Sequence, residues 1–154
     1  RSRLLVLLRS HGGVEALNRL FLDLVAAGDP ALIDVVLEHG AEVDAQGSLA
    51  FRMACNPYGM ACSHRRVRLP DHLRTSWTDF KTVPIVRCLL NHGAIPPSGC
   101  AVGSLSVGIV SCLVEFGHRE ALRHPRTFGT AVFWVERAMI NYLMQQGADV
   151  DAGI

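Results

Sequence analysis

Residues 31–45 read ALIDVVLEHGAEVDA, an apolar helical pattern that ends at a glycine and continues into an acidic, turn-prone string. The apolar residues recur at spacings of three and four, which places them on one face of a helix. Gly40 follows the last of them, and glycine is the residue that most often ends a helix in the left-handed conformation. The stretch therefore predicts a short helix, a glycine cap and a loop.

The same pattern occurs at three further places along the chain. In each, apolar residues run at helical spacing up to a closing glycine: PIVRCLLNHG at 84–93, GIVSCLVEFG at 108–117 and AMINYLMQQG at 138–147. The last of these continues as GADVDA, close to the GAEVDA at 40–45. Recurrence of this kind is the sequence signature of a repeat protein, in which units stack on their neighbours.

The repeated pattern resembles the ankyrin repeat family, whose second helix ends in a leucine-rich run followed by Gly-Ala-Asp-Val-Asn or a close variant. The resemblance extends from about Val14 to the end of the chain. It implies an all-α protein, an ankyrin-type α-solenoid of about four helix-turn-helix units with short hairpin loops and one long insertion. Members of the family typically recognise proteins through the hairpin tips and the exposed faces of the first helices.

The closing glycines are 53, 24 and 30 residues apart, against an ankyrin period of about 33 residues. One unit therefore carries an insertion and the next is short. We expect a single ankyrin repeat domain over residues 1–154, with partial units at 1–13 and 148–154, full units at about 14–45, 46–93, 94–117 and 118–147, and an insertion at 56–82.

Some helix boundaries follow from local chemistry. Residues 15–25 are expected to form the first helix of the first unit, with Asp29 capping the second helix and Pro30 at its first position. The first helix of the second unit is either 48–55, with Ser48 as its cap, or 72–80. Pro84 is expected to start the second helix of that unit. We expect the third unit to comprise helices at 97–102 and 106–116, and the fourth at 127–135 and 136–146.

Composition restricts the function classes. The chain has 154 residues and a net charge of +1, which argues against a nucleic-acid or membrane-surface protein. No apolar run approaches the roughly 20 residues that span a bilayer. The five cysteines are an odd number among aliphatic neighbours, so we expect an intracellular protein, cytoplasmic or nuclear. Because the sequence begins without Met, we also expect it to be part of a longer protein.

Motifs for catalysis are absent from the sequence. It contains no Gly-x-Ser-x-Gly, no phosphate-binding glycine loop and no His-Glu-x-x-His, so we expect no enzyme and no cofactor. One set of metal-ligand types surrounds the insertion, namely Cys55, Cys62, His64 and His72. We favour the interpretation that these are packed or exposed thiols and solvated histidines.

Four other residues that could carry chemistry receive structural interpretations. Cys88 and Cys112 occupy equivalent positions in two second helices, and we expect both to pack as small apolar residues between units. His92, like His39, precedes a closing glycine, where a cation interacts favourably with the last helical carbonyls.

The family resemblance and the charge pattern together suggest where a protein partner would bind. The insertion has five basic residues against two acidic ones. The expected partner-binding residues lie in three places. Glu42 and Asp44 are expected on a hairpin, and Arg52 and Trp134 on first helices. The insertion is expected to contribute Arg65, Arg66, Arg68 and Trp77. Two alternatives remain: a structural segment of a longer repeat array, or a metal- or nucleic-acid-binding module centred on residues 55–82.

Overall fold

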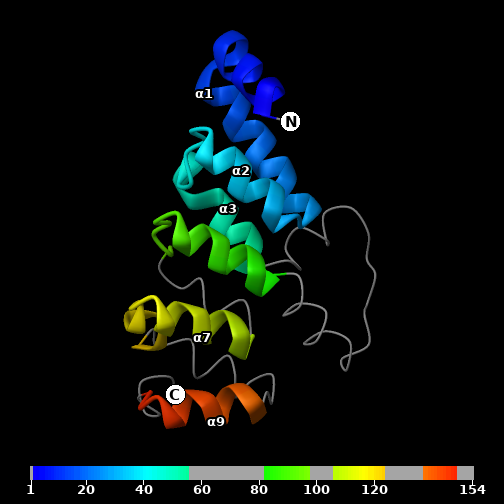
Figure 1. Ribbon diagram of the computed structural model, residues 1–154. Helices are drawn as coiled ribbons and strands as arrows, with labels where there is room; N and C mark the ends of the chain where they lie inside the picture. Colours follow the sequence, from blue (N-terminus) through cyan, green and yellow to red (C-terminus); the bar gives the residue numbers. More distant parts are fainter. Residues whose placement is uncertain (1, 56–81, 98–105, 124–136, 149–154) are drawn as a thin grey trace, which may run out of the picture.

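The computed structural model describes residues 2–55, 82–97, 106–123 and 137–148, and within these ranges the regular structure is entirely helical, as predicted. The elements are α1 (Ser2–Ala27), α2 (Pro30–Glu38), α3 (Ala45–Cys55), a helix over residues 82–91, α7 (Val107–Glu115), the 3₁₀ helix η1 (Arg119–Arg123) and α9 (Arg137–Gln145). Figure 1 shows α2, the 82–91 helix, α7 and α9 following one another along the length of the molecule.

The long helix α1 consists of two helical segments that meet at Gly13, where φ is 66° and ψ is −167°. The predicted first helix at 15–25 lies in the second segment, which continues to Ala27 and contacts both α2 and α3. The first segment lies within residues 1–13, the range expected as a partial unit. Its Leu5 is buried in the core. The two segments are therefore separate packing elements joined by one glycine.

Two helices begin with the N-caps that their sequences favour. The Asp29 carboxylate accepts a hydrogen bond of 3.1 Å from the amide of Leu32, and Pro30 lies in the first turn of α2, as predicted. At α7 the Ser106 hydroxyl accepts in the same way from the amide of Ile109, also at 3.1 Å. In both cases the side chain satisfies an amide that has no partner within the helix.

The four second helices end in one geometry. Each closing glycine has a positive φ, between 75° and 98°, and its amide donates at 3.0 Å to the carbonyl three residues earlier. The amide that follows donates to the carbonyl five residues earlier, at 2.8–3.2 Å. This pair of bonds is the Schellman motif. The shared pattern predicted from the sequence thus corresponds to a shared helix ending, at Gly40, Gly93, Gly117 and Gly147.

The same register places equivalent residues in the core. The fourth residue before the closing glycine is at most 2% exposed in all four helices: Val36, Leu89, Leu113 and Leu143. These side chains belong to one cluster of buried residues that runs from Leu5 to Leu143. The apolar surface of each helix is therefore removed from water by neighbouring elements, without a separate core in each unit.

The structure corrects two of the predicted boundaries and adds one element. Ser48 is not an N-cap: its φ is 60°, within a left-handed turn at residues 46–48, and its hydroxyl donates to Asp44 at 2.9 Å. The 82–91 helix is already formed at Thr82, before Pro84. The 3₁₀ helix η1, which packs against α7, was not predicted.

Several predicted elements can be placed and others cannot. Of the two alternatives for the first helix of the second unit, 48–55 is helical within α3 from residue 49 onward, whereas 72–80 lies outside the described residues. The insertion up to residue 81, the expected first helix at 97–102 apart from Pro97, and the expected first helix at 127–135 also lie outside them. Among the helices that are described, none combines the length and apolar content needed to cross a bilayer.

Candidate functional site

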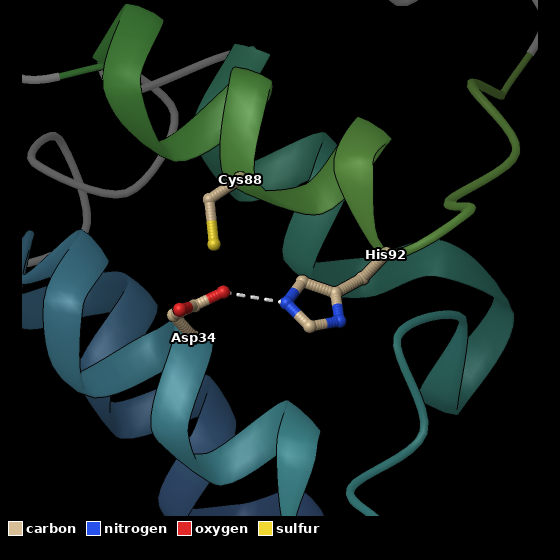
Figure 2. Close-up of side chains that lie close together, drawn as sticks. All are labelled: Asp34, Cys88 and His92. Carbon is tan, nitrogen blue, oxygen red and sulfur yellow. Dashed lines mark hydrogen bonds and ion pairs between the residues drawn. The ribbon is translucent and has the colours of Figure 1, made fainter.

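Three polar side chains meet where the 82–91 helix faces α2. Asp34 comes from the middle of α2, while Cys88 and His92 lie four residues apart, at the end of the 82–91 helix. A spacing of four places two side chains on the same face of a helix. Figure 2 shows the three side chains converging across the space between the two ribbons. We call this group the inter-unit triad.

The triad is compact and half-open to solvent. The Nε2 of His92 lies 2.6 Å from Oδ1 of Asp34, and the ligand atoms of all three residues lie within 4.8 Å of one another. Because a carboxylate only accepts hydrogen bonds, Nε2 is the nitrogen that donates. The Cys88 thiol donates a long hydrogen bond, 3.8 Å, to the carbonyl of Pro30. The side chain of Asp34 is 53% exposed and that of His92 26%.

The surroundings of Cys88 favour the protonated thiol. Burial, and to a smaller extent the negative charge of Asp34, raise its pKa to about 11. The nucleophilic form of cysteine is the thiolate, which catalytic sites stabilise by lowering the pKa. In addition, the second ring nitrogen of His92 points away from Cys88 in Figure 2, so the order thiol, imidazole, carboxylate of a catalytic relay is not formed. The geometry does not favour nucleophilic catalysis at Cys88.

The chemistry of the triad suits a metal ion better. A thiolate, an imidazole and a carboxylate are the three side-chain ligand types of Zn²⁺ in proteins. They come here from two different helices, so an ion held by them would connect α2 to the 82–91 helix. Among the described residues this is the one group of His, Cys, Asp and Glu close enough to share an ion.

The interface between the 82–91 helix and α7 involves equivalent positions but different side chains. Arg87 lies in the 82–91 helix at the position that Asp34 has in α2, six residues before the closing glycine, and its guanidinium donates to Glu115 of α7 at 2.8 Å. The same Nη2 lies 3.6 Å from the sulfur of Cys112, which is the counterpart of Cys88. In both interfaces, the residue six positions before one closing glycine lies close to the residue five positions before the next closing glycine. These pairs are Asp34 with Cys88 and Arg87 with Cys112.

The loops that follow the closing glycines are tied to their neighbours. The amide of Glu42 donates to Asn18 of α1 at 2.8 Å, and the Asn18 side chain donates back to the Glu42 carboxylate at 3.2 Å. The Asp44 carboxylate accepts from Ser48 and, at 3.3 Å, from the amide of Ile95 in the next loop. Ile95 itself is 69% exposed. The tips of these two loops are therefore held in place by hydrogen bonds to neighbouring elements.

A second surface lies along α1. An open groove of about 450 Å³ follows the exposed side of its second segment. Its lining combines charged residues with a few apolar ones, namely Gly12, Glu15, Ala16, Arg19, Leu20 and Asp23.

The predicted partner-binding residues fall into two groups. Glu42 and Arg52 are exposed and Asp44 is partly buried, each at the element predicted for it. Arg65, Arg66, Arg68, Trp77 and Trp134 lie outside the described residues. The structure therefore describes the positions of Glu42, Asp44 and Arg52, and their role in binding a partner stays a prediction.

The three described cysteines, Cys55, Cys88 and Cys112, have different surroundings. Cys55 is 1% exposed in the core of α3, whereas its proposed co-ligands Cys62, His64 and His72 lie outside the described residues. Cys112 packs in the core as predicted. Cys88 is only partly buried and faces Asp34.

The two histidines before closing glycines also differ. His39 donates through Nδ1 to the carbonyl of Val35 at 2.7 Å, which agrees with the predicted role at a helix end. For His92 that prediction is wrong, because its ring turns to the carboxylate of Asp34 on the neighbouring helix. The triad joins side chains of two helices far apart in the sequence, and the pattern within either helix alone does not indicate it. Aligned on the closing glycines, Asp34 takes the position of Arg87, so the alignment alone does not indicate its contact with His92.

Comparison with models of known protein families, with curated proteins and with solved structures found no match.

Proposed function

We propose that this chain is a non-catalytic, intracellular scaffold that binds a protein partner, built as an ankyrin-type α-solenoid of about four units. The observation that carries the proposal is the repeated register of α2, the 82–91 helix, α7 and α9: one helix ending, one buried position and one succession along the molecule. Units of this kind bury their apolar faces against neighbours and leave an extended surface open for binding.

Two described surfaces are suited to the partner. The loop tips offer an exposed carboxylate at Glu42 and an exposed apolar side chain at Ile95, held in order by the hydrogen bonds through Asp44. The groove on α1 offers Arg19 between Glu15 and Asp23, with Leu20 at its floor. Loops held by hydrogen bonds lose less entropy when a partner binds than free loops do.

The test compares partners captured by matched variants, using quantitative mass spectrometry after crosslinking. Ile95→Gln removes an exposed apolar side chain from the tips, and Arg19→Ala removes the charge in the groove. Met144→Gln is the control, because Met144 is equally apolar, 56% exposed and located on α9, away from both surfaces. We expect a specific protein that Met144→Gln retains and that Ile95→Gln or Arg19→Ala loses by about tenfold, the effect of roughly 1.4 kcal/mol at a contact residue.

Two results would contradict the proposal. One is that the wild-type chain captures no protein above the background of an unrelated helical protein. The other is that the three variants retain every partner equally, which would favour a structural segment of a longer array. Removing Pro57 to Asp79 adds a further arm: loss of the partner there, with the tip and groove variants unaffected, would transfer the binding site to the insertion.

A further inference from the structure

We propose that Asp34, Cys88 and His92 form a Zn²⁺ site that joins the second helices of two neighbouring units. The inference is independent of the proposed partner binding, because the triad contributes neither to the loop tips nor to the groove on α1. It rests on three observations: the types of the three ligands, the distances between their atoms and the elements that hold them.

The ligand set selects the kind of metal. Zinc is bound in proteins by Cys sulfur at about 2.3 Å, His nitrogen at about 2.0–2.1 Å and carboxylate oxygen at about 2.0–2.2 Å. Calcium and magnesium prefer oxygen ligands alone, so the sulfur and nitrogen of Cys88 and His92 argue against them. A softer, tetrahedral ion is favoured, and Zn²⁺ is the abundant ion that accepts this mixture without redox chemistry.

The distances require only side-chain movement. Two light ligand atoms on a tetrahedral zinc ion are roughly 3.4 Å apart, from the bond lengths above. His92 Nε2 and Asp34 Oδ1 are now 2.6 Å apart and must separate by less than about 1 Å, while the sulfur must approach from within 4.8 Å. Rotation about side-chain torsions achieves both, since the thiol hydrogen bond to Pro30 is long and weak.

The backbone positions of the ligands are fixed by the core. Ile33 and Leu89, next to Asp34 and Cys88 in sequence, are fully buried. The two helices therefore hold their places while the ligands rotate, and ligands on rigid elements lose little entropy on binding. Because Asp34 is 53% exposed, a water molecule can occupy the fourth position.

Protons balance in the binding step. The Cys88 thiol loses its proton to solvent as the Zn–S bond forms. In a neutral ring the proton on His92 Nε2 moves to Nδ1, so that the Nε2 lone pair is available to the ion. Asp34 binds through a carboxylate oxygen, which already accepts the hydrogen bond from His92. One proton therefore leaves the protein for each ion bound to neutral His92, and binding releases the hydrogen bond between His92 and Asp34.

The test titrates the full chain, freed of metal by a chelator and then dialysed, with Co²⁺ as a coloured substitute and with Zn²⁺ by calorimetry. We expect one ion per chain, thiolate-to-cobalt charge-transfer absorption, and displacement of Co²⁺ by Zn²⁺. Cys88→Ser should abolish the charge-transfer band. Loss of a group that only supports a metal ligand typically lowers metal affinity by about 10–100-fold. Asp34→Asn and His92→Gln each remove a ligand itself, so each should lower Zn²⁺ affinity by more than that.

Two measurements separate this site from other outcomes. Circular dichroism checks that the variants fold, which the partial exposure of all three side chains favours. Cys62→Ser combined with His64→Gln is the matched control, because it removes one thiol and one imidazole that do not belong to the triad. This double variant should leave Zn²⁺ binding unchanged. A wild-type chain that shows no charge-transfer band would overturn the proposal. So would a band that survives Cys88→Ser and disappears in the control.

Discussion

At the scale of single residues, the closing glycines decide where the second helices end. Gly93 has a φ of +80°, and a Cβ added there would meet nothing within 4 Å. Its replacement by alanine therefore tests the backbone alone. We expect Gly93→Ala to lower the free energy of unfolding by about 1–2 kcal/mol, the cost of the left-handed conformation for an L-residue. Urea denaturation followed by circular dichroism measures it.

Two comparisons make the test of Gly93 specific. Gly93→Asn should cost less than Gly93→Ala, because asparagine tolerates the left-handed region. Gly117→Ala should cost about as much as Gly93→Ala, since Gly117 has a φ of +88° and the same open space around it. An alanine at either position that leaves stability unchanged would argue against the shared helix ending.

The reactivity of Cys88 is a second prediction at this scale. With its pKa raised from 9.0 to about 11, the thiolate fraction near neutral pH falls about 100-fold. In the presence of EDTA we expect iodoacetamide to label Cys88 correspondingly slowly and the rate to rise about tenfold per pH unit up to about pH 10. Peptide mass spectrometry separates Cys88 from the other cysteines.

The cause of this shift can be examined by removing one charge. Asp34→Asn eliminates the smaller cause of the raised pKa, so labelling of Cys88 should accelerate while burial keeps it slower than an exposed thiol. Glu38→Gln is the control, because it removes a carboxylate from the same helix that does not contribute to the shift. Equal rates in Asp34→Asn and Glu38→Gln would rule out the charge of Asp34 as a cause.

What the sequence predicts at this scale is chemistry within a few residues. The Asp29 cap, the Pro30 start and the Gly40 ending depend on atoms no more than five residues apart, and all three are found. The contact between His92 and Asp34 joins residues 58 apart. Helical spacing alone does not determine it, because it depends on how two units are rotated against each other.

At the scale of elements, the break in α1 depends on Gly13. Its φ of 66° with ψ of −167° lies in a region that essentially only glycine occupies. No atom lies within 4 Å of a Cβ added there, so crowding is not involved. We expect Gly13→Ala to lower the free energy of unfolding by about 1–3 kcal/mol. Hydrogen exchange should locate the loss of protection in the segment before the break, which contains Leu5.

The outcome for Gly13 can be distinguished from a general effect on α1. Ala26→Gly and Ala27→Gly change exposed positions in the same helix and should cost at most about 1 kcal/mol each, without selective loss of protection before residue 13. If Gly13→Ala is tolerated as well as these, the two segments do not depend on the glycine for their arrangement.

Elements differ in how far their sequence predicts them. In α2 and α7 a cap, apolar spacing and a closing glycine occur together, and these three signals agree. The start of α3 does not: Gln46 and Ser48 are non-glycine residues with positive φ, which few sequences indicate. There the hydrogen bonds that Asp44 accepts, one from the next loop, compete with the local preference of Ser48 to cap a helix.

At the scale of the whole molecule, a continuous core predicts graded effects of the same substitution in different units. Leu89 and Leu143 are both fully buried and both stand four residues before a closing glycine. Truncation of a buried leucine to alanine typically costs about 2–5 kcal/mol. Leu89 lies in the interior of the array, whereas α9, which contains Leu143, packs on α7 at the end of the described elements.

In a stack whose units contact only their neighbours, the loss of one unit weakens the units on either side of it. We therefore expect Leu89→Ala to reduce amide protection in α2 and α7 as well as in the 82–91 helix, and to lower the global free energy of unfolding. Leu143→Ala should reduce protection in α9 and, to a smaller extent, in α7, while α1 and α2 remain as in the wild type. Native-state hydrogen exchange resolves the helices individually. A uniform loss of protection along the chain in both variants would instead indicate a single cooperative core, and the interaction of units through their neighbours would have to be abandoned as the source of stability.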